Sequence, residues 1–85
     1  MVMTHAVVDV GRWLEGKDVR AAAIGAVGTN VTDYVAVDGS NNIAVTADVH
    51  DMDAARAMIT APPPEAAALM EEHGVVQPIT AHIEA

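Results

Sequence analysis

The sequence predicts an α+β fold in which a four-stranded antiparallel sheet carries two helical segments on one face. Three observations lead to this prediction. Four segments are rich in valine, isoleucine and threonine, alanine-rich stretches separate the outer segments from the inner ones, and a Gly-Ser-Asn-Asn turn joins the inner two. The order of elements is therefore β-α-β-β-α-β.

The first half of the chain is expected to form a strand, a helix and a second strand. Residues 4–10 (THAVVDV) are rich in β-branched side chains, and Gly11 ends this run. Residues 12–27 include the helix-forming run AAAIGA, although Gly16 weakens the first half of the helix. Residues 29–38 (TNVTDYVAVD) are typical of the second strand.

The turn at residues 39–42 (GSNN) predicts an antiparallel hairpin between the second strand and a third strand at residues 43–50. A helix over residues 52–60 can be capped by either Asp51 or Asp53.

Three prolines at residues 62–64 interrupt this helix, and a second short helix follows and ends near Gly74. Residues 75–84 (VVQPITAHIE) form the last strand, in which Pro78 favours an edge position.

This order of elements is the split βαβ, or ferredoxin-like, pattern. Right-handed connections place the first and third strands in the centre and both helical segments on one face. The 85 residues make a single domain with a limited core, and the chain has neither cysteine nor phenylalanine. Since no disulfide can stabilise so small a core, we expect a homodimer.

Charge and hydropathy exclude several classes of partner. The formal net charge is −8 and no cluster of Lys or Arg is present, which argues against nucleic acid and anionic membrane surfaces. No apolar run is long enough to span a bilayer, and the first ten residues lack the pattern of a signal peptide. We therefore expect a cytoplasmic protein.

Alternate side chains of a strand point to opposite faces of a sheet, so the sequence divides the strand residues into two sets. The nearly apolar set, expected beneath the helices, comprises Ala6, Val8, Val10, Val31, Val35, Val37, Ile43, Val45, Ala47, Val49, Val75, Ile79, Ala81 and Ile83. The other set comprises His5, Val7, Asp9, Thr32, Tyr34, Ala36, Ala44, Thr46, Asp48, His50, Val76, Pro78, Thr80, His82 and Glu84.

The second set allows two interpretations. It is either the solvated face of an open antiparallel sheet or the lining of a pocket for a small-molecule ligand. Small apolar residues are interspersed with histidine, tyrosine and aspartate in it, and basic residues are missing from it. This mixture favours a pocket.

Five residues of this face are the candidate catalytic residues. His5 suits a general base, because imidazole titrates near neutral pH, and His82 would lie beside it if the first and last strands pair. Tyr34 can polarise a carbonyl group. Asp48 and His50 share a face, where a carboxylate can fix the tautomer of an imidazole. Each of the five can instead be an ordinary residue of the sheet surface.

Other chemistries have less support. Three histidines and a carboxylate could bind a metal, but their spacing matches no compact metal motif, and we expect no metal and no cofactor. Nucleophilic catalysis lacks a cysteine, and the single serine, Ser40, lies in the turn. Trp13 is expected in the core, and His73 is expected to stabilise a helix C-terminus.

The order of elements, the length and the histidine within THAVVDV resemble the dimeric α+β barrel superfamily. The resemblance implies two ferredoxin-like subunits with their open sheet faces together, and a cavity between sheet and helices or at the dimer seam. Members include small cyclases, isomerases, cofactor-independent monooxygenases and haem-degrading enzymes. His5 matches the first-strand histidine of the cyclase-like members. The low aromatic content here argues against a large flat aromatic substrate.

The leading hypothesis is a cofactor-independent acid/base enzyme, of the cyclase, isomerase or dehydratase type, that acts on a small carbonyl compound. A non-catalytic module of the same fold that binds a small ligand or mediates assembly is the second hypothesis. A metal- or haem-dependent enzyme is the third.

Overall fold

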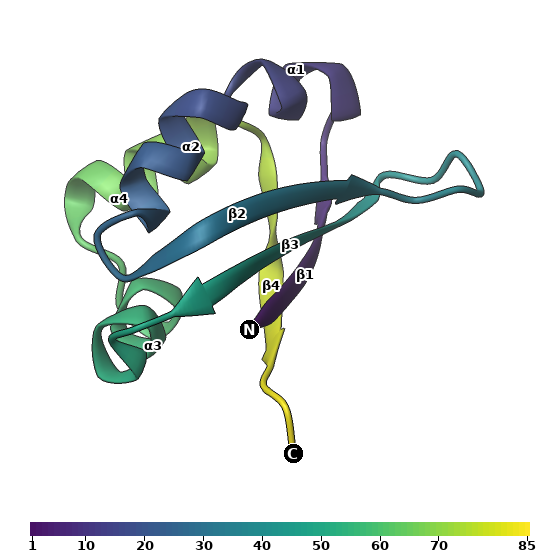
Figure 1. Cartoon of the computed structure of the whole chain (residues 1–85). Helices are drawn as coiled ribbons and strands as arrows, with labels where there is room; N and C mark the ends of the chain where they lie inside the picture. Colours follow the sequence, from purple (N-terminus) through teal and green to yellow (C-terminus); the bar gives the residue numbers. More distant parts are fainter.

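Figure 1 shows the computed structural model, which describes residues 1–85, the whole chain. Its elements follow the order β-α-α-β-β-α-α-β. They are β1 (Val2–Val7), α1 (Val10–Glu15), α2 (Lys17–Ile24), β2 (Gly28–Val35), β3 (Asn42–Val49), α3 (Met52–Thr60), α4 (Pro64–Glu72) and β4 (Val75–His82).

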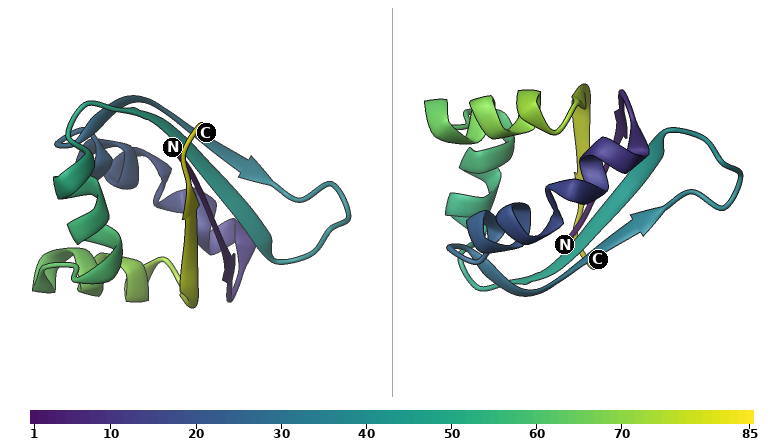
Figure 2. Two further views of the ribbon diagram at one scale, coloured as in Figure 1. Left: turned by 90° about the horizontal axis from the view of Figure 1, so that it is seen from below. Right: turned by 90° about the horizontal axis from the view of Figure 1, so that it is seen from above.

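The four strands form one antiparallel sheet in the order β2-β3-β1-β4. The first and third strands are therefore central, and β4, which contains Pro78, lies at an edge where a missing N–H is tolerated. The helices lie on one side of the sheet (Figure 2). These features confirm the predicted ferredoxin-like α+β fold.

The β2–β3 hairpin confirms the predicted turn and extends well beyond the rest of the sheet (Figure 1). Gly39 adopts a positive φ of 77°, a conformation that glycine accepts without steric cost. The Oδ1 atom of Asp38 accepts a hydrogen bond of 2.8 Å from the amide of Ser40. Because the turn begins early, β2 ends at Val35 and not at residue 38 as predicted.

The first helical segment begins earlier than predicted and consists of two helices. Asp9 caps α1, because its Oδ1 atom accepts a hydrogen bond of 2.8 Å from the amide of Arg12. Gly11 therefore lies inside α1 instead of ending a strand, and Gly16 separates α1 from α2. As a result, β1 ends at Val7, three residues before the predicted end of the strand.

The second helical segment agrees closely with the prediction. Asp51 is the residue that caps α3, with its Oδ1 atom 3.1 Å from the amide nitrogen of Ala54. Pro64 occupies the first turn of α4, where its missing N–H would have no partner in any case. Gly74 follows α4 with a positive φ of 73°.

The core lies between the sheet and the helices. Trp13 of α1 is fully buried, as predicted, and packs with Val7, Ile43 and Val45 of the central strands. Helices do not cover the opposite face of the sheet (Figure 2). None of the helices combines the length and the hydropathy that crossing a membrane requires.

Candidate active site beneath the helices

The predicted face of the first strand is wrong: Val8 and Val10, which were expected beneath the helices, lie outside β1, and the other set of side chains faces the helices. His5 pairs with Ile43, whose exposed fraction is only 3%. Directly opposed residues of an antiparallel pair share a face, so His5 points toward the helices. Its neighbours on that face are Met3, opposite the buried Val45, and the buried Val7.

The open face holds Tyr34, Asp48 and His82 as predicted, but it does not bring them together. Tyr34 lies on β2 and His82 on β4, which are the two opposite edges of the sheet. The carboxylate of Asp48 is 3.4 Å from the side-chain amide nitrogen of Asn30. His50 follows β3 and is exposed. The proposed Asp48–His50 pair shows no hydrogen bond between its side chains.

A wide hollow of about 540 Å³ lies on the open face. Its lining includes Thr4, Ala6, Tyr34, Ala44, Val76 and Pro78. Two predicted catalytic residues, His5 and Tyr34, are among its lining residues, and of these Tyr34 lies on the open face. The hollow is open to solvent and resembles an uncovered surface more than an enclosed site.

A second cavity, of about 100 Å³, lies between the sheet and helices α2, α3 and α4. Three residues with side-chain nitrogens line it, namely His5 from β1, Arg20 from α2 and His73 from the end of α4. The remaining lining is hydrophobic and includes Met58 and Leu69. This cavity combines a pocket with convergent polar groups, the combination typical of small-molecule sites.

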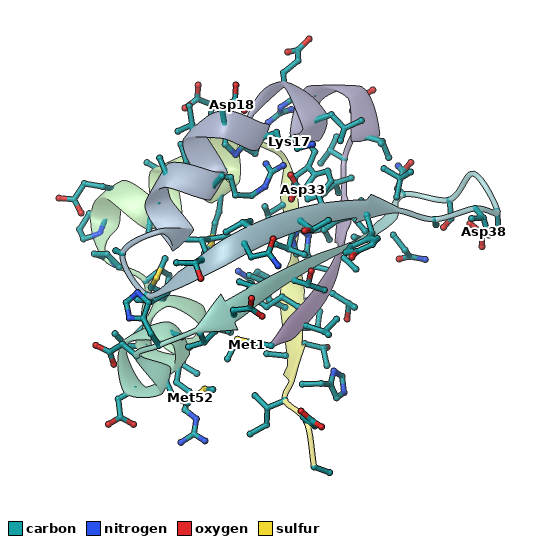
Figure 3. All side chains as sticks on the ribbon, in the orientation of Figure 1. Met1, Lys17, Asp18, Asp33, Asp38 and Met52 are labelled. Atoms are coloured by element: carbon teal, nitrogen blue, oxygen red, sulfur yellow. The ribbon has the colours of Figure 1, made fainter.

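Arg20 is the only cation of the cavity, and Asp33 balances its charge. The exposed fractions of the two side chains are 11% and 3%, and Nη2 of Arg20 lies 3.4 Å from Oδ2 of Asp33. Asp33 lies between β2 and the helices above it (Figure 3). A buried charge requires such a partner, since an isolated ion is strongly unfavourable in the interior.

Two contacts with Trp13 fix the guanidinium of Arg20. Its Nη1 atom donates a hydrogen bond of 2.9 Å to the carbonyl of Trp13, and its Cζ atom lies 4.0 Å from the centroid of the indole ring. Trp13 belongs to α1 and Arg20 to α2, so these contacts join the two helices across the break at Gly16. The guanidinium is therefore held in one plane.

The second contact of Nη1 of Arg20 is with the imidazole of His73. Nη1 of Arg20 lies 3.4 Å from Nδ1 of His73, so Nδ1 is the acceptor and the imidazole carries its proton on Nε2. Burial lowers the pKa of His73, and the positive charge of Arg20 lowers it further. The ring packs directly against Gly16, where a side chain would overlap it. His73 occupies the C-cap of α4, as expected, and also lines the cavity.

His5 is held as a neutral base. Its Nδ1 atom lies 2.8 Å from the carbonyl oxygen of Ala6 and donates to it, which leaves the lone pair on Nε2. Burial lowers the pKa of His5; the Ala6 carbonyl opposes this effect, and Arg20 adds to it. The ring makes an edge contact with Trp13, with centroids 6.3 Å apart.

The sequence interpretation missed Arg20, Asp33 and the second role of His73. One signal was present, because Asp33 has the same parity as Val31 and Val35 of the apolar set and so places a charge under the helices. Nothing in the pattern marks His73 as a cavity residue. No three His, Asp or Glu side chains converge closely enough to hold a metal ion.

The function proposed below rests on the geometry of the cavity, because comparisons with known proteins found no match. No protein-family model, curated protein or solved structure matches this chain.

Proposed function

We propose that the protein is a cofactor-independent acid/base enzyme that acts on a small organic carbonyl compound in the cavity between the sheet and the helices. His5 is the base and Arg20 stabilises the developing negative charge. One observation carries the proposal: a neutral imidazole with a free Nε2 lone pair and a buried guanidinium line the same cavity.

The chemistry follows from these two groups. Nε2 of His5 removes a proton from the carbon next to the carbonyl, and the electron pair of the C–H bond moves onto the carbonyl oxygen. Arg20 stabilises this oxyanion in a site of low dielectric constant, where such stabilisation is strong. His5 then returns the proton to the same or a neighbouring carbon, which gives isomerisation, or to a leaving hydroxyl group, which gives dehydration.

The assignment differs from the one that the sequence suggests. His5 remains the base, but Arg20 takes the polarising role expected of Tyr34, and His73 takes the assisting role expected of His82 or the Asp48–His50 pair. Pockets for drug-sized ligands occupy about 300–1,000 Å³. A cavity of about 100 Å³ restricts the substrate to a compound of a few carbon atoms.

Exchange of hydrogen for deuterium at carbon tests the proposal without knowledge of the natural substrate. We expect the protein to accelerate exchange next to the carbonyl in at least one member of a panel of small ketones, aldehydes and 2-oxo acids in D₂O, followed by proton NMR. His5→Gln should slow this exchange by about 100-fold or more, which is the usual contribution of a general base. His82→Gln is the matched control and should change little, because His82 lies on the other face.

Two results would contradict the proposal. One is a complete lack of acceleration across the panel. The other is an accelerated exchange that survives in His5→Gln.

A second proposal concerns assembly. We propose that the open sheet face packs against a second copy of the chain, in the manner of the dimeric α+β barrel superfamily. Val2, Tyr34 and Val76 are 40%, 49% and 41% exposed on this face, and the last two line the hollow of about 540 Å³. A small core of this kind gains stability if a partner covers these side chains.

Sedimentation velocity tests the dimer. Ala44→Glu introduces a charge in the middle of the open face and should yield a monomer, whereas Ala22→Glu on the exposed side of α2 should not. A wild-type protein that sediments as a monomer at high concentration would contradict the proposal.

A further inference from the structure

The cavity between the sheet and the helices adjoins a second, smaller void. This void has a volume of about 30 Å³ and lies between the sheet and helices α2 and α3. All nine of its lining residues are hydrophobic. Four residues line both spaces and therefore form the wall between them, namely Met3, Ile24, Met58 and Ile59.

We infer that the cavity takes an uncharged aliphatic carbonyl compound, and that Met58 sets the length of the alkyl chain that fits. The inference deepens the proposed function and rests on it for the carbonyl group of the ligand. Binding of such a compound can be measured whether or not turnover occurs.

The cavity offers no free charge to an ionic ligand. Asp33 balances the charge of Arg20 at a distance of 3.4 Å, and the Nε and Nη2 groups of the guanidinium are buried. Its Nη1 group is occupied by the Trp13 carbonyl and Nδ1 of His73. Burial lowers the pKa of His5 and His73, which favours neutral imidazoles. An ionised ligand would lose its hydration without gaining a partner, which is strongly unfavourable.

The same arrangement is compatible with the role proposed for Arg20. Its charge acts through space on an oxyanion that forms only during the reaction, and such electrostatic stabilisation needs no ionised group in the bound substrate. The charge of Arg20 therefore favours the transition state without selecting an anion in the ground state.

The rest of the lining suits an alkyl chain. Away from the side-chain nitrogens it is hydrophobic, with Leu69 and Met70 from α4 and Ile79 from β4. Each CH₂ group that moves from water into such surroundings strengthens binding about fourfold. Helix α4 contains no buried residue, and segments with few buried contacts open locally at low cost. Opening of α4 is therefore the expected route of entry.

The position of the smaller void gives the direction of the chain. His5 and Met3 follow each other on the face of β1 that points to the helices. The smaller void begins at Met3 and continues along Ala47 and Val49 of β3. An alkyl chain that extends from a carbonyl group at His5 toward this void therefore meets Met58, whose long unbranched side chain adapts its conformation easily.

Titration with 2-pentanone and butanoate tests the preference for an uncharged ligand, because the two molecules share a shape and differ only in a CH₃ group in place of O⁻. We expect the ketone to shift the NMR signals of the His5 and His73 rings. It should bind at least about tenfold more tightly than butanoate near neutral pH. Equal or tighter binding of butanoate would overturn the inference.

The series from 2-butanone to 2-octanone tests the role of Met58. In the wild type, affinity should rise about fourfold with each CH₂ group and stop rising at the length that reaches Met58. Met58→Ala should move this limit to a longer chain by one carbon or more. Met58→Val removes less of the side chain and should move the limit in the same direction, which preserves the test if the alanine variant does not fold. A limit that stays unchanged in the folded Met58 variants contradicts the inference.

Two further variants show whether the smaller void provides the added room. Met52→Ala makes the same substitution at the start of α3, where Met52 lines neither space, and should leave the limit unchanged (Figure 3). Ala47→Val fills the smaller void, so Met58→Ala/Ala47→Val should restore the wild-type limit. A shifted limit in Met52→Ala, or a longer limit that persists in the double variant, would rule out Met58 as the determinant.

The two proposals can fail separately. If the ketones bind with a limit set by Met58 but no carbonyl compound exchanges deuterium, the enzyme proposal fails and the aliphatic site stands. If short ketones exchange through His5 but the length limit does not respond to Met58, the enzyme proposal stands and the present inference fails.

Discussion

The guanidinium carbon of Arg20 lies 4.0 Å from the centre of the Trp13 ring, so a cation is stacked on a side chain that is fully buried. This contact joins α1 to α2 and places both above the sheet, where Asp33 of β2 supplies the opposite charge. Such a cation–π contact contributes about 2 kcal/mol when it is desolvated. The core of this small domain is therefore partly polar, and its stability depends on a few specific partners.

Replacement of Arg20 alone should lower the free energy of unfolding much more than replacement of both Arg20 and Asp33. Arg20→Met leaves Asp33 as a buried charge without a partner, which should lower the free energy of unfolding by about 3–5 kcal/mol. Arg20→Met/Asp33→Leu removes both charges and should recover most of this loss. Urea unfolding followed by the fluorescence of Trp13, the single tryptophan, measures both values.

Arg56→Met is the control for this pair of variants, because Arg56 is exposed and should change stability by less than about 0.5 kcal/mol. If the double variant is as unstable as Arg20→Met, the charge of Asp33 is not the cause of the loss.

Only glycine fits at position 16, because the ring of His73 packs directly against it. Replacement of glycine by alanine usually stabilises a helical segment, but a Cβ atom at Gly16 would overlap the imidazole. Gly16→Ala should therefore destabilise the protein by about 1–3 kcal/mol, the usual cost of overpacking. In a His73→Ala background the same substitution should be neutral or stabilising. A double-mutant cycle that shows simple additivity would contradict the contact.

The sequence predicts the order of elements, the hairpin and the bounds of α3 because each depends on local signals. Asn and Gly mark the turn, and Asp51 and Pro64 mark helix starts. The face of β1 could not be predicted in the same way. Val8 and Val10 favour the opposite face, but Asp9 caps α1, so Val10 begins that helix and neither valine belongs to β1. A shift of one residue exchanges the two faces of a strand.

Of the residues that line the cavity, the sequence identified His5 but not its partners, because the face of β1 could not be predicted. His5 stands out by its chemistry whichever face it occupies, but its partners depend on that face. Once His5 points under the helices, its neighbours are Arg20 and His73 and not His82 or Tyr34. The contact of His73 with Arg20 joins residues 53 positions apart. No local pattern encodes a contact at that separation.

Two neighbouring aspartates at the start of α3, Asp51 and Asp53, should contribute to stability in different ways. Asp51 accepts a hydrogen bond from the amide of Ala54, whereas Asp53 lies in the first turn and acts only through its charge. Asp51→Ala should lower the free energy of unfolding by about 1 kcal/mol. Asp53→Ala should cost less, about 0.3–1 kcal/mol, and this cost should shrink at high salt. Equal, salt-sensitive losses in both variants would show that Asp51 acts by charge alone.

Stability should fall as the solution becomes mildly acidic. Burial lowers the pKa of both His5 and His73 below the ordinary value of 6.5 in the folded protein. Between 6.5 and those lowered values, the unfolded chain binds more protons than the folded one, so the free energy of unfolding decreases as pH decreases. The full stability is present above pH 6.5, and the loss levels off once the folded imidazoles are also protonated.

Urea unfolding from about pH 8 to about pH 5 measures this dependence. His5→Gln/His73→Gln should have a flatter profile than the wild type, because glutamine does not titrate. His82→Gln should keep the wild-type slope, since His82 is exposed on the opposite face. Carboxylates contribute equally to all three profiles, so the difference in slope isolates the two buried imidazoles. An unchanged slope in the His5/His73 variant would mean that neither ring is kept neutral by the fold, and the base assigned to His5 would lose its physical support.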